Sequence, residues 1–505
     1  MVMNVVTAVV SLACQLLINF WLSPYLVSHI GIEANGFVSL ANNFVTYASL
    51  IVTALNSMAS RFITIAYAQK DIKKANLYYN SVFWGNLIIV AVLLLPASIL
   101  CFWPDKFITV PANLLYDVRI LFAMVFLAFF LKTGFPNWDC GTYVANRLDR
   151  DNIPNIIIQI VRCAFLVLAY TLLKPHVYYI GIAGVLVCIM QLIVAHWNMR
   201  TFVPEMRVSF GKNGILCSKS ALTELVGAGI WNSISSIGNI LIDGVDLLVC
   251  NLLLGATPMG IVAVSKTLPS CITQFANSIR WAFLPQLTLN YAAGDKEKTQ
   301  KDMHISMRVL CFIVTIPLAI IIAVGTDFYK LWMPSQDPQL LYILSVLASI
   351  TFAFTGSSYL LTNVFTVTNT VKANSIARII TGVISICVTV AIAKFTNYGI
   401  YAVACVSSIM GILREIIFTL PYAAKALGFD KQFFFKEMLA NIICAAILCA
   451  VCCLIRRFMP AGTWLQLVLT CAVMGVVCVV LNYFILFRKN ERSTVLSMVR
   501  AKLKI

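Results

Sequence analysis

The stretch GIEANGFVSLANNF, residues Gly31 to Phe44, has a copy further along the chain, GATPMGIVAVSKTL, residues Gly255 to Leu268. Two glycines of each stretch coincide when the stretches are aligned without a gap. The same register then pairs Tyr67-Ala68 with Tyr291-Ala292, Asp71 with Asp295, and Lys74 with Lys298. Duplicated halves are common in transporters, and this chain is predicted to contain such an internal repeat.

The repeat lies in a strongly apolar chain. Of its 505 residues, 60% are hydrophobic and 11% are charged, and the mean hydropathy is +0.89. Apolar runs of about 20 residues, the length of a helix that spans a bilayer, recur from one end to the other. They predict an all-α integral membrane protein with about 14 transmembrane helices, or twelve if two weak neighbours are fused. The predicted spans start near residues 5, 36, 80, 115, 153, 178, 224, 260, 306, 338, 376, 398, 436 and 464.

The net charge of +17 is concentrated in every second loop between the predicted spans. Lys and Arg collect in alternate loops, and the intervening loops hold few of them. By the positive-inside rule the basic loops and both termini are cytoplasmic, so the number of spans is even. The first run, Val5 to Ile30, is too long for a signal-peptide core and has no basic leader, so we expect a retained span. We expect no nucleic-acid partner.

Cysteine and histidine give no sign of a metal site. The seventeen cysteines are scattered through the spans without CxxC or Cys/His ligand spacing, and the four histidines are dispersed. The cysteines are interpreted as small apolar packing residues. We expect no metal, no cofactor and no catalytic residues.

The repeat and the spans together predict the domain organisation. Residues 1–221 are predicted to form an N-terminal six-helix lobe and residues 222–430 a C-terminal six-helix lobe. Two further transmembrane helices and a basic cytoplasmic tail are expected over residues 431–505. Because both halves start on the same side of the membrane, their symmetry axis should lie along the membrane normal.

Each half contains a helix with one polar face. At 100° per residue, five polar residues of the second copy fall within about 80° of arc, with apolar residues opposite. They are Lys266, Ser270, Thr273, Asn277 and Arg280, and the matching residues of the first copy are Asn42, Thr46, Ser49, Thr53 and Asn56. Lipid cannot satisfy such groups, so we expect the two stripes to line a central hydrated cleft and to bind substrate. Such a cleft is typical of an alternating-access transporter.

The seventh span also has a polar face, formed by Asn232, Ser236, Asn239, Asp243 and Asp246. Asn239 and Asp243 correspond to Gln15 and Asn19 of the first span. If either aspartate lacks a partner, burial favours its protonated form and makes it a coupling site for a proton or sodium ion. Asp243, Asp246 and Asn239 are therefore the candidate ion-coupling residues.

The cations of the stripe have alternative interpretations. Lys266 and Arg280 favour a polyanionic substrate such as a phosphate or pyrophosphate. Arg280 could instead extend to cytoplasmic headgroups, and Lys266 could pair with Asp246, which should lie at a similar depth.

The fifth span offers one more candidate. Arg162 shares a face with Asn155 and Gln159, as in a cavity wall or a hydrogen-bonded cluster between helices. Lys132 could face a cavity or extend to the interface.

Three segments together resemble a known superfamily. They are GIEANGFVSLANNFVTYASLIVTALNSMASRFITIAYAQKD, its copy GATPMGIVAVSKTLPSCITQFANSIRWAFLPQLTLNYAAGD, and IDGVDLLVCNLLLG directly before that copy. They resemble the polysaccharide-export branch of the multidrug, oligosaccharidyl-lipid and polysaccharide exporter superfamily, and most of all a Wzx-type O-antigen or capsule repeat-unit flippase. The resemblance implies a MATE-like fold of two six-helix lobes in a V, with two additional helices.

The resemblance also implies a function. Such a flippase moves an undecaprenyl-pyrophosphate-linked oligosaccharide from the cytoplasmic to the periplasmic leaflet of the bacterial inner membrane, with H+ or Na+ as candidate coupling ions. Its partners would be the lipid-linked substrate, membrane lipids and polysaccharide-assembly proteins. In related flippases, arginines and acids on spans one, two, seven and eight line the cleft. Here the first span has no cation and the second has none before Arg61, which leaves Lys266, Arg280 and Arg162 as candidates for the pyrophosphate.

The sequence disfavours two other functions. A cation-coupled multidrug extruder of the same fold would use acids to bind cationic drugs, and the basic stripe and the fourteen spans disfavour it. An integral-membrane glycan polymerase or glycosyltransferase would normally have a large outer loop, whereas the outer loops here are short. We therefore expect a transporter and not an enzyme.

Overall fold

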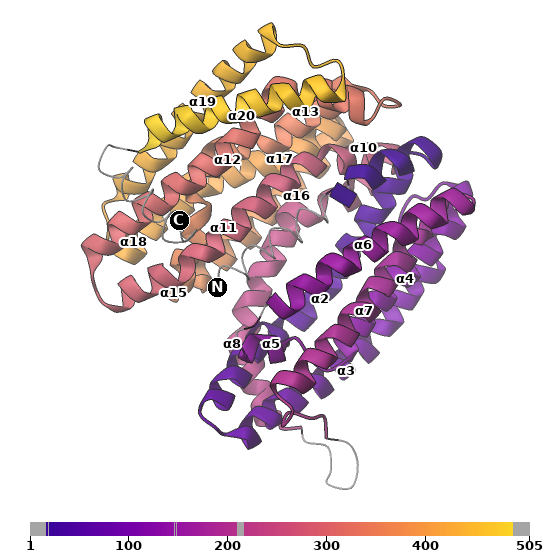
Figure 1. Ribbon diagram of the computed structural model, residues 1–505, viewed down its shortest axis with the longest axis vertical. Helices are drawn as coiled ribbons and strands as arrows, with labels where there is room; N and C mark the ends of the chain where they lie inside the picture. The colour runs from indigo at the N-terminus through magenta and orange to yellow at the C-terminus, as the bar shows by residue number, and fades with distance from the viewer. Residues whose placement is uncertain (1–16, 19, 146, 148, 210–216, 488–505) are drawn as a thin grey trace. The chain divides into compact units, whose positions relative to one another are not determined.

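The computed structural model describes residues 17–487 except 19, 146, 148 and 210–216 (Figure 1). Over these residues the chain forms helices joined by short loops, with no β-strand. The predicted all-α fold class is confirmed. Twelve helical segments in this part of the chain are long and apolar enough to cross a membrane.

The other two predicted spans account for the difference from fourteen. About half of the first span, residues 5–16 and 19, lies outside the described residues. Within its described part, residues 20–29 form a continuous helical stretch. The eighth is interrupted at Lys266, which divides it into α10 (Ala256–Ser265) and α11 (Thr267–Ala292). Neither of these two pieces belongs to the twelve, although α11 has 26 residues.

The chain divides into two compact units. The first unit comprises Met1–Ile240 and Gly255–Gly260, and the second comprises Leu241–Leu254 and Ile261–Ile505. The division falls within the seventh and eighth spans. The predicted domain boundaries, 1–221, 222–430 and 431–505, follow the sequence repeat and not the contacts between helices, and they stay a prediction.

In the first unit, α2 packs against α3 and α8, and α4 packs against α3 and α7 (Figure 1). Its buried core includes Leu55, Ile63, Tyr79 and Met199. The helices are α2 (Ile32–Ala68), α3 (Ile72–Phe102), α4 (Leu115–Gly134), α5 (Cys140–Val144), α6 (Asp149–Leu172), α7 (Tyr178–Phe202) and α8 (Lys219–Asn239), with short turns η1 (Pro104–Lys106) and η2 (Ala112–Leu114).

In the second unit, α12 is the central helix and packs against α11, α13, α19 and α20. The elements that follow α8 are the π-helical turn η3 (Ile240–Gly244), α9 (Asp246–Leu254), α10, α11, α12 (Lys296–Trp332), α13 (Pro338–Ser349), α14 (Thr351–Thr355), η4 (Ser358–Leu360), α15 (Leu361–Val367), α16 (Val371–Phe395), α17 (Gly399–Arg414), the π-helical turn η5 (Glu415–Thr419), α18 (Leu420–Leu427), α19 (Lys431–Phe458) and α20 (Trp464–Leu486).

The repeat is visible in the backbone of its connecting turns. Asp71 caps α3 by accepting a hydrogen bond of 2.9 Å from the Lys74 amide, and Asp295 caps α12 by accepting one of 2.9 Å from the Lys298 amide. Both caps satisfy an amide that the first turn of a helix leaves without a partner. The residue before each cap is left-handed, with φ of 62° at Lys70 and 70° at Gly294. The predicted equivalence of these two loops is confirmed.

The first turns of α2 and α10 repeat each other as well. Gly31 and Gly255 both have positive φ, 120° and 97°, a conformation that glycine adopts without strain. Gly36 and Gly260 lie against each other, so that a Cβ on Gly36 would stand 3.0 Å from the Gly260 Cα. Only residues without a side chain permit this close approach.

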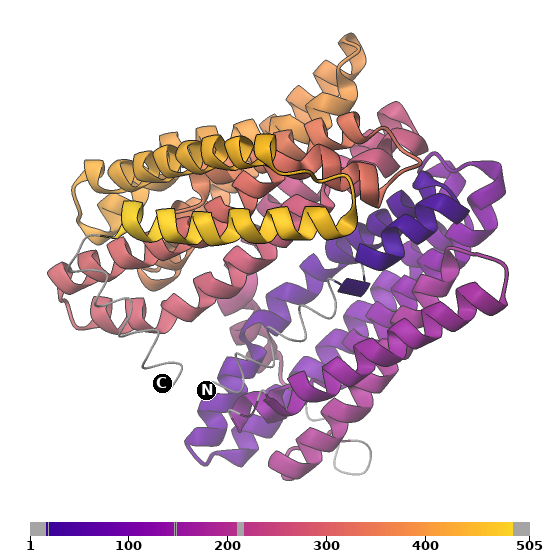
Figure 2. The ribbon, with the colours of Figure 1, turned by 45° about the horizontal axis from the view of Figure 1, so that its top comes forward.

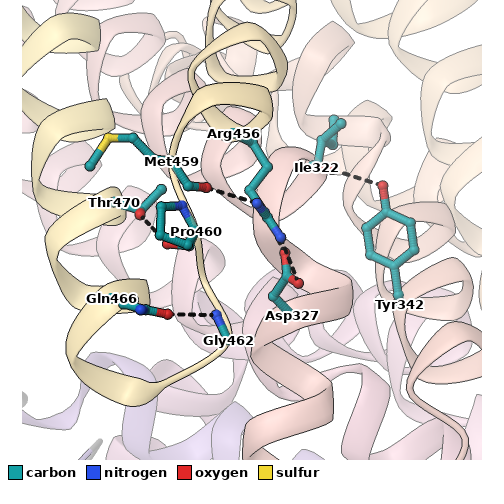
Figure 3. A network of polar contacts seen from close by, with 9 residues as sticks. All are labelled: Ile322, Asp327, Tyr342, Arg456, Met459, Pro460, Gly462, Gln466 and Thr470. Atoms are coloured by element: carbon teal, nitrogen blue, oxygen red, sulfur yellow. Dashed lines mark hydrogen bonds and ion pairs between the residues drawn. The ribbon is translucent and has the colours of Figure 1, made fainter.

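The last two helices are attached to the second unit through α12. Arg456 of α19 makes a paired contact with Asp327 of α12, at 2.6 Å from Nε and 2.9 Å from an Nη nitrogen, and its other Nη donates to the Met459 carbonyl at 2.8 Å (Figure 3). Asn482 of α20 donates to the Phe312 carbonyl and to Thr315 Oγ1, both at 3.2 Å. α19 and α20 run side by side in both views (Figures 1 and 2).

Candidate functional site

The polar stripe of α2 is accessible along most of its length. Asn42 and Thr46 are exposed, and Ser49, Thr53 and Asn56 are half-buried. The first four hydrogen-bond to carbonyls one turn earlier in their own helix, at 2.7–2.9 Å, and to no other described residue. Their lone pairs remain available, since each side chain donates to the backbone. The stripe therefore presents hydroxyl and amide acceptors along one face of the first unit.

The stripe of α11 is similar to that of α2 at Ser270 and Thr273 and differs from it at Arg280. Ser270 is exposed and donates to the Thr267 carbonyl at 2.7 Å, and Thr273 donates to the Pro269 carbonyl at 3.2 Å. Asn277 and Arg280 are half-buried. The Arg280 guanidinium lies 5.8 Å from the centre of the Tyr359 ring, within range of a cation–π contact. This stripe thus lies on the second unit and includes a cation.

The helix break at Lys266 has a local cause. Pro269 has no amide hydrogen, so the carbonyl of Ser265 lacks its usual helical partner. The hydroxyl of the buried Tyr329 donates to that carbonyl instead, at 3.2 Å. The break leaves Lys266 as the residue between α10 and α11.

Lys266 forms an ion pair with Asp246 of α9. The carboxylate is buried, 5% exposed, and Ser407 of α17 hydrogen-bonds to both of its oxygens at 3.1 and 3.2 Å. The Lys266 side chain keeps 26% of its surface. Sequence reasoning left a pair or a substrate contact open for Lys266, and the pair is present.

Asp243 differs from Asp246 in its surroundings. It lies in the π-helical turn η3 and keeps accessible surface, although protein atoms surround it closely. It makes no hydrogen bond or ion pair to any residue that the structure describes. It interacts electrostatically with Asp246, Lys266, Arg414 and Arg378. Single π-helical turns inside α-helices are frequent at functional sites. Of the two aspartates, Asp243 is therefore the one whose oxygens are available to an ion.

Residues of a larger charged network surround Asp243, and sequence reasoning did not assemble them. Arg378 of α16 donates to Thr362 Oγ1 at 3.3 Å and interacts with Arg414 and Glu415, and Glu415 is 5% exposed. We call six residues of the second unit the charged network: Asp243, Asp246, Lys266, Arg378, Arg414 and Glu415. It contains three acids and three bases, so its formal charge is zero.

The rest of the polar face of the seventh span is used partly for packing. Asn232 donates to Ser57 of α2 at 3.2 Å, and the neighbouring Ser233 donates to the Leu50 carbonyl at 3.0 Å. Asn239 is exposed. Gln15 and Asn19, the predicted counterparts of Asn239 and Asp243 on the first span, lie outside the described residues.

The candidate residues of α6 do not act together. Asn155 accepts a hydrogen bond of 3.0 Å from Gln191 and lines a cavity inside the first unit. Gln159 and Arg162 do not line that cavity. The Nε of Arg162 is buried, and no described residue hydrogen-bonds to it.

A family comparison agrees with this architecture. Residues 2–289, more than half of the chain, match the family model described as "Polysaccharide biosynthesis protein". The chain belongs to this family. A relative from Bacillus subtilis (strain 168), the uncharacterized membrane protein EpsK, is 26% identical over 489 residues, which cover 96% of this chain and 95% of that protein.

Two solved structures share the fold. Lipid II flippase MurJ, in an inward closed conformation, matches with a TM-score of 0.64 at 14% identity and covers 96% of this chain and all of that one. An inward-facing MATE-family multidrug resistance transporter of the MOP superfamily matches with a TM-score of 0.60 at 15% identity over 83% of this chain and 98% of that one. With the family match, these similarities confirm the predicted superfamily, its polysaccharide branch and the MATE-like fold. The chain is a multi-pass membrane protein of the polysaccharide biosynthesis family.

Proposed function

We propose that this protein is a flippase that carries a lipid-linked oligosaccharide repeat unit, on undecaprenyl pyrophosphate, from the cytoplasmic to the outer leaflet. The main support is a pair of accessible polar stripes, on α2 and α11, at matching positions of a repeat in a polysaccharide biosynthesis protein. A glycan that crosses a bilayer needs hydrogen-bonding groups along its way, because lipid tails supply none. The hydroxyls and amides of the stripes supply them.

Arg280 is the best candidate for contact with the pyrophosphate. Lys266 is neutralised by Asp246, whereas Arg280 has a planar guanidinium that can bind phosphate oxygens in pairs. Arg162 is a second candidate, because its buried Nε has no partner among the described residues. Ser270, Thr273 and Asn277 lie along the same stripe as Arg280 and would contact the sugars.

Asp243 is the proposed coupling residue for H+ or Na+. Its exposed carboxylate has no direct partner within the described residues, and the neighbouring cations of the charged network can respond to its neutralisation. Asp246 is already paired and would act only through the network, and Asn239 lies one helical turn before Asp243.

The finer context of the proposal follows from charge and resemblance. Both termini are placed in the cytoplasm, in a bacterial cytoplasmic (inner) membrane, and the product would serve O-antigen, lipopolysaccharide or capsule assembly together with polysaccharide-assembly proteins. The two lobes and the appended helices are placed at 1–221, 222–430 and 431–505.

Reconstitution into proteoliposomes with a lipid-linked oligosaccharide tests the proposal. We expect the purified full chain to expose the glycan to an external glycosidase at a faster rate than empty liposomes do. Arg280→Gln should slow this rate strongly and Arg280→Lys less, whereas Thr171→Val, an exposed residue at the end of α6, should leave it unchanged. Transport of a cationic dye with no movement of the lipid-linked glycan would replace the flippase with a multidrug extruder.

A further inference from the structure

The first unit contains a half-open cavity of about 470 Å³. Its walls come from α2, α3, α4, α6 and α7 and from the loop Phe135 to Asp139. By the distribution of charge, this loop is on the predicted cytoplasmic side. Cavities of a few hundred cubic ångströms are typical of small-molecule sites.

The lining of the cavity is rich in carboxamides. Asn56, Asn86, Asn137, Asn155 and Gln191 all contribute to it. A carboxamide both donates and accepts hydrogen bonds, as a sugar hydroxyl does. A lipid chain would need an apolar lining, so this cavity favours a polyhydroxylated ligand.

One of these amides is buried and incompletely satisfied. Asn86 is 3% exposed, and its Nδ2 donates to Asn56 Oδ1 at 3.1 Å. The Oδ1 of Asn86 has no hydrogen-bond partner among the described residues. A buried carbonyl without a partner costs about 1–3 kcal/mol. Rotation of the Asn86 amide toward the cavity would let a ligand hydroxyl offset that cost.

The remaining walls combine an aromatic ring, which suits the apolar face of a sugar, with charged groups. Trp138 lies at the cavity with its ring centre 5.6 Å from that of Phe135 and 4.5 Å from that of His196. Lys132 also lines the cavity and forms no ion pair with a described residue. The carboxylate of Asp151 is occupied by Thr142 and by Asn198, the latter at 2.8 Å. Asp139 is a second carboxylate of the lining, so the walls present both signs of charge to a ligand.

The cavity is continuous with the α2 stripe. Asn56 is the last residue of the stripe toward the predicted cytoplasmic end, and it belongs to the cavity wall together with Val52. Asn56 is therefore the point at which the stripe meets the cavity.

We infer that this cavity binds the glycan part of the substrate, as a short run of neutral sugar residues, before the substrate crosses the membrane. The inference rests on the proposed function, but it concerns a site within the first unit that is separate from the α11 stripe and from the charged network. Asn86 and Asn56 bind sugar hydroxyls at the inner end, and Trp138 covers a ring face.

The test uses the purified full chain and the lipid-linked oligosaccharides extracted from its source strain. Mild acid releases the free glycans, and the probe is this released fraction, with inorganic pyrophosphate as a comparison. We expect the glycans, and not pyrophosphate, to raise the melting temperature of the protein in a saturable way. Asn86→Leu should weaken glycan binding by about tenfold or more, which corresponds to about 1.4 kcal/mol.

A second variant tests the inference if Asn86→Leu does not fold. Asn155→Leu combined with Gln191→Leu removes both partners of one hydrogen bond, which leaves no buried orphan, and it should fold and bind glycan at least about tenfold more weakly. Thr171→Val on α6 is the matched control and should bind like the wild type. Equal binding by all variants, stabilisation by pyrophosphate alone, or no response to glycans overturns the inference. Flipping of the intact lipid-linked substrate in proteoliposomes is measured separately. Loss of the proposed glycan binding and loss of the proposed flippase activity therefore give different results.

Discussion

Thr257 donates a hydrogen bond of 2.6 Å to the carboxylate of Glu33, and the two residues lie 224 residues apart, the offset of the internal repeat. Each is therefore the counterpart of the other. Equivalent residues of a repeat can contact each other only where a local symmetry axis passes between them. Gly36 and Gly260, another equivalent pair, lie against each other in the same two turns. The first turns of α2 and α10 thus keep the symmetry of the repeat in their packing.

The packing of α8 on α2 predicts opposite effects for two nearby glycines. A Cβ on Gly229 would collide with the Ala54 carbonyl, whereas one on Gly227 would meet no atom within 4 Å. We expect Gly229→Ala to lower the free energy of unfolding by about 1–3 kcal/mol. Gly227→Ala should be neutral or stabilising by about 0.5–1 kcal/mol, since alanine favours the helix. Thermal unfolding in detergent measures both, and equal melting temperatures would contradict the close contact.

The left-handed turns of the repeat make a second prediction. Gly294 has φ of 70°, and nothing lies within 4 Å of its Cβ position. Gly294→Lys reproduces the residue found at Lys70 and should cost about 1 kcal/mol through backbone strain alone. The reverse change, Lys70→Gly, should not destabilise the protein by more than a few tenths of a kcal/mol, because the strain it relieves offsets the added chain entropy. The melting temperature measures both changes. A fall of several degrees for Lys70→Gly would show that the lysine side chain itself stabilises the turn.

The Lys266–Asp246 pair can be separated into a structural and a functional part. Lys266→Met leaves a buried carboxylate with Ser407 as its hydrogen-bond donor and should destabilise the protein by about 3–5 kcal/mol. Adding Asp246→Leu should restore much of that stability, because neither member of the pair is then left as an unpaired buried charge. Glycan flipping by the double variant decides the role of the lysine. Full activity assigns Lys266 to structure, and lost activity in a stable protein assigns it to the substrate.

Asp243 provides a test of ion coupling. Asp243→Asn cannot exchange a proton, so we expect flipping to become independent of the imposed H+ or Na+ gradient while the protein remains folded. Asp105→Asn, which removes an exposed ion pair with Arg119, is the control and should keep the gradient dependence. If the Asp243 variant still responds to the gradient, the coupling residue lies elsewhere.

Local signals allowed much of the fold to be predicted. The repeat register correctly paired Asp71 with Asp295, because an N-cap aspartate depends on only three residues of chain. The α2 stripe was likewise correctly placed on one accessible face, since helical periodicity fixes it. The break at Lys266 was missed, although Pro269 was its visible signal, because the hydroxyl that replaces the missing bond comes from Tyr329 on α12.

Sites assembled from distant segments could not be predicted in this way. The alternation of basic loops assigns Arg378 to a cytoplasmic loop, yet it lies two turns inside α16 and belongs to the charged network. Its depth in an apolar helix was the available signal. The cavity of the first unit depends on five helices and a loop, and only Asn155, Lys132 and Asn56 among its lining residues had been singled out. Periodicity identifies the polar face of a single helix, but it does not identify the residues that other helices contribute to the same cavity.

The equal number of acids and bases in the charged network has an electrical consequence. A group of charges that sums to zero does no net work when it shifts as a body through the field of an energised membrane. A proton bound at Asp243 leaves that group with one positive charge, on which a potential of 100 mV does about 2.3 kcal/mol of work over a full crossing. Under the coupling proposed for Asp243, the voltage then acts on the loaded form of the charged network and not on its empty form, so a single titrating carboxylate would set the direction of the cycle.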